Sequence, residues 1–159
     1  MLLLLGPSKM MNPWQYITKR IAENKWGAYV ARRVARPIDL RLIPLSNGYL
    51  NTGLGTRWGK SIGLLTCWGA KSGAERKIPL LYTRFGESII LVASKAGEKT
   101  NPAWFYNLRK KPECTMQSRG HCAAYVARQV SGEEYDKAWS IACENYPGYE
   151  KYKARVERI

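Results

Sequence analysis

Short segments rich in apolar and β-branched residues recur between Ile62 and Val130, and turn residues separate them. The connections within residues 69–73, 85–87 and 119–121 are short enough for antiparallel hairpins. Consecutive strands joined in this way favour a barrel or a strongly curled antiparallel sheet. We predict strands at residues 62–68, 77–84, 88–94, 113–118 and 122–130.

Helical patterns precede, interrupt and follow these strands. Asn-Pro pairs, which are typical of helix starts, open the segments 12–36 and 101–110. The first segment mixes apolar and basic residues, which predicts a basic amphipathic helix that either packs on the domain or lies on anionic lipid. Ser131 and Glu134 have the spacing of a capping box at the start of a C-terminal helix, which Pro147 ends.

The charge of the chain indicates an anionic partner. A length of 159 residues is typical of one domain with one core, and 26 Lys and Arg against 12 Asp and Glu give a net charge of +14. Such a surplus creates a field that attracts anions. Nucleic acid, an anionic membrane surface and a polyanionic cofactor would each account for the surplus, so motifs must distinguish among them.

The cysteine pattern argues against a metal site. The 4 cysteines contain no C-x-x-C pair, and His121 is the single histidine. We therefore expect no bound metal and read the cysteines as free, buried thiols, which fits a reducing cytoplasm.

The segment 69–79 gathers several cations around one predicted hairpin turn, whose glycines allow backbone amides to approach a ligand. A solvated basic hairpin is the simpler interpretation, and the neighbouring segments favour the other. Antiparallel pairing would bring strand 77–84 beside strand 88–94, and the loop after it leads into the helix at 101–110. The three segments would form a groove for a phosphate-bearing, planar ligand.

Four motifs follow one another along the chain: Gly-x-Lys-Ser-Gly-x-x-Arg-x-x-Pro-Leu at 69–80, Val-Ala-Ser-Lys at 92–95, Asn-Pro-x-Trp-x-x-Asn-Leu at 101–108 and Tyr-Pro-x-Tyr-x-x-Tyr at 146–152. In this order they resemble the motifs of the deazaflavin-dependent nitroreductase and quinone reductase family, whose members use reduced coenzyme F420 on a split β-barrel. The likeness runs from about Ile62 to Arg158. It implies an α+β, mainly β fold: a split β-barrel with an N-terminal helix, one inserted helix and C-terminal helices.

The resemblance also implies where the cofactor lies. Cations of the 69–79 turn would lie near its phosphate and oligoglutamate tail, the strand end at 92–95 beside its ring, and the inserted helix along the remaining wall. For Trp104 and Tyr106, core packing remains the alternative to stacking. The implied cofactor-binding residues are Ala70, Lys71, Ser72, Arg76, Lys77, Ile78, Pro79, Val92, Ala93, Ser94, Lys95, Ala103, Trp104, Phe105, Tyr106 and Asn107.

The implied catalytic residues are Ser94, Tyr146, Tyr149 and Tyr152, with the tyrosines closing over the acceptor. Because the deazaflavin carries the hydride, the protein supplies position and electrostatics rather than paired acid and base residues. When hydride reaches the acceptor a negative oxygen develops, which a hydroxyl or backbone amide near Ser94 would stabilise. Water or a tyrosine would then supply the proton.

The predicted function is hydride transfer from reduced coenzyme F420 to an electron-poor quinone, enone or nitro compound. An FMN-binding reductase on the same barrel is one alternative, because FMN also presents a phosphate and a tricyclic ring. A non-catalytic barrel that binds single-stranded nucleic acid is another, although most aromatic residues fall outside the strands. We expect no nucleic-acid partner.

The resemblance and the charge pattern divide the chain into a basic amphipathic helix at 1–36, a connecting segment at 37–60 and a split-barrel cofactor-binding domain at 61–159. We expect a cytoplasmic protein, a monomer or a homodimer, with peripheral contact through its N-terminal helix to the inner face of the cell membrane.

Overall fold

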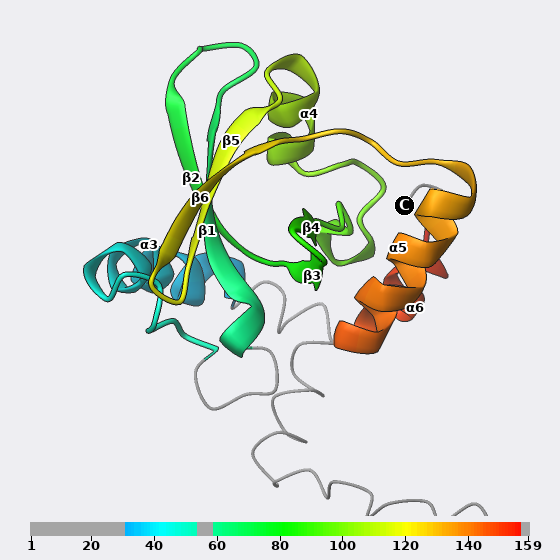
Figure 1. Cartoon of the computed structure of the whole chain (residues 1–159), viewed down its shortest axis with the longest axis horizontal. Helices are drawn as coiled ribbons and strands as arrows, with labels where there is room; N and C mark the ends of the chain where they lie inside the picture. Colours follow the sequence, from blue (N-terminus) through cyan, green and yellow to red (C-terminus); the bar gives the residue numbers. More distant parts are fainter. Residues whose placement is uncertain (1–30, 54–58, 157–159) are drawn as a thin grey trace, which may run out of the picture.

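The computed structural model describes residues 31–53 and 59–156. Within them the chain forms antiparallel strands flanked by helices, drawn from blue to red in Figure 1. The elements are η1 Ala31–Ala35, α3 Arg36–Leu45, η2 Gly59–Ser61, β1 Ile62–Trp68, β2 Glu75–Leu81, β3 Thr83–Phe85, β4 Ser88–Ile90, η3 Lys95–Gly97, α4 Ala103–Lys110, β5 Glu113–Ser118, β6 His121–Val126, α5 Gly132–Asn145 and α6 Gly148–Lys153.

The strands are divided between two sheets. A four-stranded sheet has the order β2-β1-β5-β6, and β3 pairs with β4 in a separate two-stranded sheet. All neighbouring strands are antiparallel, with Ile62 opposite Leu81 and Thr83 opposite Ile90. The predicted strands 62–68 and 113–118 are therefore confirmed with their bounds, and the strand expected at 122–130 ends at Val126.

The strand predicted at 77–84 is wrong as a single element, because Tyr82 interrupts it. The backbone N–H of Tyr82 donates to Ser61 O at 2.9 Å, and its hydroxyl lies 3.0 Å from Ser118 Oγ. Residues before Tyr82 pair with β1, and residues after it pair with β4. The groove was expected from pairing between strands 77–84 and 88–94. Of this pairing only the short β3–β4 hairpin is present.

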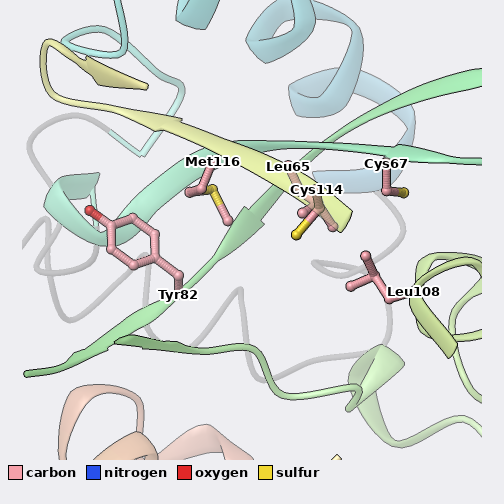
Figure 2. Packing of buried hydrophobic residues seen from close by; sticks show 6 residues of the cluster. All are labelled: Leu65, Cys67, Tyr82, Leu108, Cys114 and Met116. Carbon is pink, nitrogen blue, oxygen red and sulfur yellow. The ribbon is translucent and has the colours of Figure 1, made fainter. Parts of the chain in front are cut away.

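Two hydrophobic clusters of buried residues hold these elements together. The first lies between the four-stranded sheet and α4, where side chains from β1, β5 and α4 converge with Tyr82 (Figure 2). The second lies between α5, α6 and the strand β4. Burial of this apolar surface supplies the main driving force for packing the helices on the strands. The first cluster consists of Leu65, Cys67, Tyr82, Leu108, Cys114 and Met116, and the second of Ala142, Tyr146, Tyr149 and Tyr152.

Helix α3 lies in the region that we predicted as a connecting segment, residues 37–60. Its prolines suggested a break, but Pro37 stands in the first turn, where no intrahelical N–H bond is lost. The buried carboxylate of Asp39 fixes the helix to the following loop, since it accepts bonds from Thr52 N at 2.6 Å and Thr52 Oγ1 at 2.9 Å. Most of the helix predicted at 12–36 lies outside the described residues.

The inserted and C-terminal helices are confirmed as α4, α5 and α6. The capping box is wrong, because the side chain of Ser131 makes no cap bond although Ser131 is the N-cap residue. Glu134 instead pairs with both guanidinium nitrogens of the exposed Arg128, one of them at 2.7 Å. This pairing holds the pKa of the Glu134 carboxyl below its ordinary value. The ion pair of Glu134 with Arg128, six residues upstream, thus replaces the bond to the helix start that the capping-box spacing suggested.

The hydroxyl bond of Tyr82 provides a test of the strand break. Tyr82→Phe is expected to lower the free energy of unfolding by about 1 kcal/mol, because the buried hydrogen bond between the Tyr82 and Ser118 hydroxyls is lost. Urea denaturation measures the change. Tyr125→Phe is the matched control, since the Tyr125 hydroxyl has no protein partner within the described residues, and it should change stability by less than about 0.5 kcal/mol. Equal losses in the two variants would contradict the assigned bond.

Candidate active site

The turn between β1 and β2 is a compact loop held by its own backbone. Gly69 N donates to Ala74 O at 2.8 Å, and Gly73 N donates to Gly69 O at 2.8 Å. Gly73 has φ +68°, a left-handed conformation in which a side chain is strained. We call residues 69–76 the basic turn. Figure 1 shows it beside α4, away from α5 and α6.

The side chains of the basic turn are exposed and organised by one hydroxyl. Ser72 Oγ accepts a bond from Arg76 Nη2 at 3.2 Å and from Ala74 N at 3.3 Å, which directs the Arg76 guanidinium toward the loop. Lys77 pairs with Glu75 at 3.2 Å, so part of its charge is neutralised. Lys71 and Arg76 have no ion-pair partner within the described residues. They are the cations of this hairpin that remain available to a ligand.

The backbone N–H donors also mark the tip of the basic turn as a place where a ligand could bind. The N–H groups of Gly69, Ala70, Gly73 and Ala74 all have acceptors inside the protein. The N–H groups of Lys71 and Ser72, at the tip of the loop, have none among the described residues. Backbone N–H groups in a turn form concave anion sites when they converge. The loop therefore offers backbone and side-chain donors to one negative group.

Helix α4 lies beside the basic turn and is bonded to it. Asn107 is 9% exposed, and its Oδ1 accepts from Ala70 N at 2.9 Å. Trp104 packs against the first cluster, so the core interpretation of this ring is confirmed, whereas Tyr106 is 47% exposed. Phe105 lies edge-on to both rings, with centroids 6.5 Å from Trp104 and 5.6 Å from Tyr106. The exposed Ala103 begins the helix.

The segment after β4 connects the two clusters. Leu91 packs on the first cluster and Val92 on the second, but β4 ends at Ile90, so the strand predicted to continue to Ser94 is wrong beyond that residue. Ser94 is buried, and the next three residues are left-handed, with φ +46° at Lys95, +56° at Ala96 and +77° at Gly97. A left-handed conformation costs a non-glycine residue about 1 kcal/mol or more, so surrounding contacts must hold this turn.

Side-chain contacts hold the left-handed turn at residues 95–97 in place. Lys95 Nζ donates to Thr100 Oγ1 at 2.8 Å and pairs with Glu98 at 2.9 Å. Ala96 packs against the second cluster. The predicted cofactor contact of Lys95 stays a prediction, and its ammonium is already engaged locally.

The tyrosines predicted to close over the acceptor lie in the second cluster. Tyr146, Tyr149 and Tyr152 are 7%, 4% and 7% exposed, and the hydroxyls of Tyr146 and Tyr152 lie 3.0 Å apart. Burial is the main cause that raises the pKa of Tyr149, so this phenol stays protonated at neutral pH. Burial also raises the pKa of the neighbouring Cys143 thiol to about 12, with a hydrogen bond to Glu150 adding to the shift.

The structure therefore brings the predicted residues together in two groups. One joins the basic turn to α4, with Ile78 packed on the core beneath it and Pro79 half-buried on the same strand. The other joins Val92 to the three tyrosines. The segment 89–92 lies between them, because alternate side chains enter the first and the second cluster. Ala93 and Ser94 extend this segment toward the left-handed turn.

Sequence reasoning missed Leu81 and Ile90, which pack against the tyrosines at the end of β2 and of β4. Their apolar strand pattern gave no signal that distinguishes them from ordinary core residues. Two hollows of about 460 and 470 Å³ lie elsewhere, one on the outer face of the sheet around Trp68 and one beside Asn145. Neither is lined by a predicted site residue.

The fold and the site define a small α+β protein with an antiparallel sheet, C-terminal helices and an exposed basic turn. The family model of the F420H(2)-dependent quinone reductases matches residues 46–159. The chain belongs to this family, which confirms the resemblance seen in the motifs.

Relatives in mycobacteria agree with this assignment. The F420H(2)-dependent quinone reductase Rv1261c of Mycobacterium tuberculosis is 32% identical over 98 residues, which are 60% of this chain and 66% of the relative. The putative F420H(2)-dependent quinone reductase Rv3178 of the same species is 30% identical over 88 residues, 55% of this chain and 74% of the relative. The chain thus spans 66% of the length of the first of these relatives.

Solved structures give the same fold. A structure described as an F420-H2 dependent reductase (FDR-A) is 34% identical, with a TM-score of 0.59 over 63% of this chain and 89% of the other. A structure described as a domain-swapped dimer has the same identity and TM-score over 63% of this chain and 75% of the other. Whether this chain is a monomer or a homodimer stays a prediction.

Three further findings concern metal binding, membrane crossing and the cysteines. No group of His, Cys, Asp and Glu residues in the described ranges is arranged to hold a metal ion. Within the same ranges, no helix has the length and apolar character needed to cross a bilayer. Cys67, Cys114, Cys122 and Cys143 are free thiols, but the prediction that they are buried is wrong for Cys122, which is exposed on β6, and for the half-buried Cys143.

Proposed function

We propose that this chain transfers a hydride from reduced coenzyme F420 to a quinone, with enones and nitro compounds as related acceptors. The observation that carries the proposal is the basic turn, where Lys71 and Arg76 have no ion-pair partner and two backbone N–H groups have no acceptor among the described residues. Membership of the quinone reductase family supports an enzyme over a non-catalytic nucleic-acid barrel.

The donors present fit an anionic, phosphate-bearing cofactor. The N–H groups of Lys71 and Ser72, with the side chains of Lys71 and Arg76, would bind its phosphate and acidic tail through charge-assisted hydrogen bonds. Ile78 and Val92, half-buried at the edges of the two clusters, would offer apolar surface to its ring. When bound, the deazaflavin supplies the hydride, and the protein supplies its position.

The residues near the 92–96 segment would serve the acceptor. Ser94 is buried next to the left-handed turn, where its hydroxyl would stabilise negative charge on the acceptor oxygen. The hydroxyl pair of Tyr146 and Tyr152 would hold a proton close by, and Tyr149 stays neutral and apolar beside it. We also propose that the two antiparallel sheets together correspond to the split barrel of the resemblance.

Titration with the reduced coenzyme tests the function directly. We expect saturable quenching of deazaflavin fluorescence at low ionic strength, then reoxidation when a quinone is added. A parallel titration with FMN separates the two cofactors, and a panel of quinones, enones and nitroaromatics ranks the acceptors. Binding of FMN without binding of coenzyme F420 would refute the cofactor, and binding without reoxidation by any acceptor would refute the reaction.

The outer face of α3 supports peripheral contact with an anionic membrane. Val34, Ile38, Arg41 and Leu45 are spaced along one stripe of the helical segment 31–45. The apolar members are 55%, 43% and 86% exposed, while the opposite face buries its side chains against the sheet. Apolar side chains beside an arginine fit the headgroup region of anionic lipid. A lipid-soluble quinone would be met there.

Flotation of the full chain with vesicles tests this contact. Leu45→Ser is expected to lower binding to anionic vesicles by about tenfold, since one leucine side chain buried in the lipid contributes about 1.5 kcal/mol or more. Val126→Ser removes a side chain that is 75% exposed on β6 and serves as the control. Equal binding by both variants and the unmodified chain would rule the contact out.

A further inference from the structure

Both ends of the Asn107 side-chain amide are bonded inside the protein. Its Oδ1 accepts from Ala70 N at 2.9 Å, and its Nδ2 donates to Cys67 Sγ at 3.8 Å. The side chain is 9% exposed on the second turn of α4. Buried polar groups need internal partners, and this amide has one for its donor side and one for its acceptor side. The geometry therefore argues against the direct cofactor contact that the motif suggested.

The bond to Ala70 determines where the basic turn stands. The other bonds of the turn, between Gly69, Ala74, Gly73 and Ser72, are local and fix its shape. The Asn107 bond spans 37 positions and joins the loop to a helix that packs on the core. The second bond of the amide joins Asn107 to Cys67, which is fully buried at the end of β1. This bond holds the other end of the Asn107 amide in place. Without Asn107, the loop keeps its local bonds and loses its attachment to α4.

We infer that Asn107 is a positioning residue, which holds the basic turn so that the N–H groups of Lys71 and Ser72 and the Arg76 side chain converge on one anion. This inference deepens the proposed function and rests on it. Donors that are already held in place bind a ligand more tightly, because the loop loses little conformational entropy when the ligand binds. The residue acts on affinity for the coenzyme's anionic part through the loop, without touching the coenzyme.

Asn107→Ala is the principal variant. We expect affinity for reduced coenzyme F420 to fall about tenfold, while the salt dependence of binding is unchanged because no charge is removed. Arg76→Gln should reduce both affinity and salt dependence. Cys67→Ala is the matched control, because it disturbs the same buried site and keeps the Ala70 bond; its affinity should stay within about twofold of the unmodified chain.

Hydrogen exchange of the coenzyme-free protein provides a readout that does not depend on the coenzyme. In the unmodified chain the Ala70 amide should exchange more slowly than the amides of Lys71 and Ser72. In Asn107→Ala it should exchange as fast as they do, and in Cys67→Ala it should remain protected. A protected Ala70 amide in Asn107→Ala, or unchanged affinity in that variant, would overturn the positioning role.

If Asn107→Ala does not fold, the amide resonances of the unmodified chain test the positioning role. On addition of coenzyme, the backbone amide resonances of Lys71 and Ser72 should shift strongly, and the side-chain amide resonances of Asn107 should shift little. A large shift of the Asn107 amide would indicate direct contact and overturn the inference. Absence of coenzyme binding by the unmodified chain would instead refute the proposed function, a result that none of the variants can mimic.

Discussion

Lys71→Gln/Arg76→Gln is expected to bind reduced coenzyme F420 at least about 100-fold more weakly than the unmodified chain. Each of these cations lacks an ion-pair partner within the described residues, and each lies on the basic turn. A charge-assisted hydrogen bond contributes about 1.5 to 3 kcal/mol, which is roughly tenfold or more in affinity for each residue removed. Fluorescence titration at low ionic strength measures the loss.

Lys77→Gln is the control for this double variant. It removes a cation from the same hairpin, but one that pairs with Glu75 at 3.2 Å. We expect an affinity within about threefold of the unmodified chain, because the Glu75 carboxylate already neutralises part of the Lys77 charge. If Lys77→Gln weakened binding as much as the double variant, the general charge of the surface rather than the geometry of the turn would attract the coenzyme.

The parts of the fold that the sequence predicts are those determined by local pattern. β1 and β5 have the predicted bounds, and both edges of each strand pair with a neighbouring strand. The break at Tyr82 could not be predicted, since it depends on partners at Ser61 and Ser118 that are distant in sequence. Helix α3 was missed because its prolines resemble breakers until their position in the helix is known.

The same distinction applies to the candidate site. The basic turn was recognisable because its cations and glycines are adjacent in sequence. The role of Asn107 was not, because its bond to Ala70 spans 37 positions. The burial of the tyrosines follows from packing against Leu81 and Ile90, which belong to different strands. Sequence spacing therefore located the residues, and long-range contacts determine what each one can touch.

The division of the site between two clusters has a functional consequence. The anionic part of a cofactor would be bound on the side of α4, and the acceptor would be reached on the side of α5 and α6. The segment 89–92 contributes to both clusters and is the shared wall. Variants on the first side should therefore change cofactor affinity, and variants on the second side should change turnover.

Ser94→Ala is expected to lower turnover about 100-fold while the affinity for reduced coenzyme F420 stays within about threefold. Removal of one donor that stabilises a developing negative oxygen costs about this much in other enzymes. Ser94 is 9% exposed and immediately precedes the left-handed residues Lys95 and Ala96, so water has little access to replace its hydroxyl. Steady-state kinetics with a quinone, combined with coenzyme titration, separate the two quantities.

Ser72→Ala provides the opposite pattern as a control. Its hydroxyl directs Arg76 on the basic turn, so its loss should weaken coenzyme binding and leave turnover at saturation unchanged. A larger loss of affinity than of turnover in Ser94→Ala would contradict the assigned role and place Ser94 with the cofactor rather than the acceptor. Ser72 lies on the basic turn beside α4, and Ser94 precedes the left-handed turn whose Ala96 packs on the second cluster, so the pair of variants tests the two-sided arrangement as well as either hydroxyl.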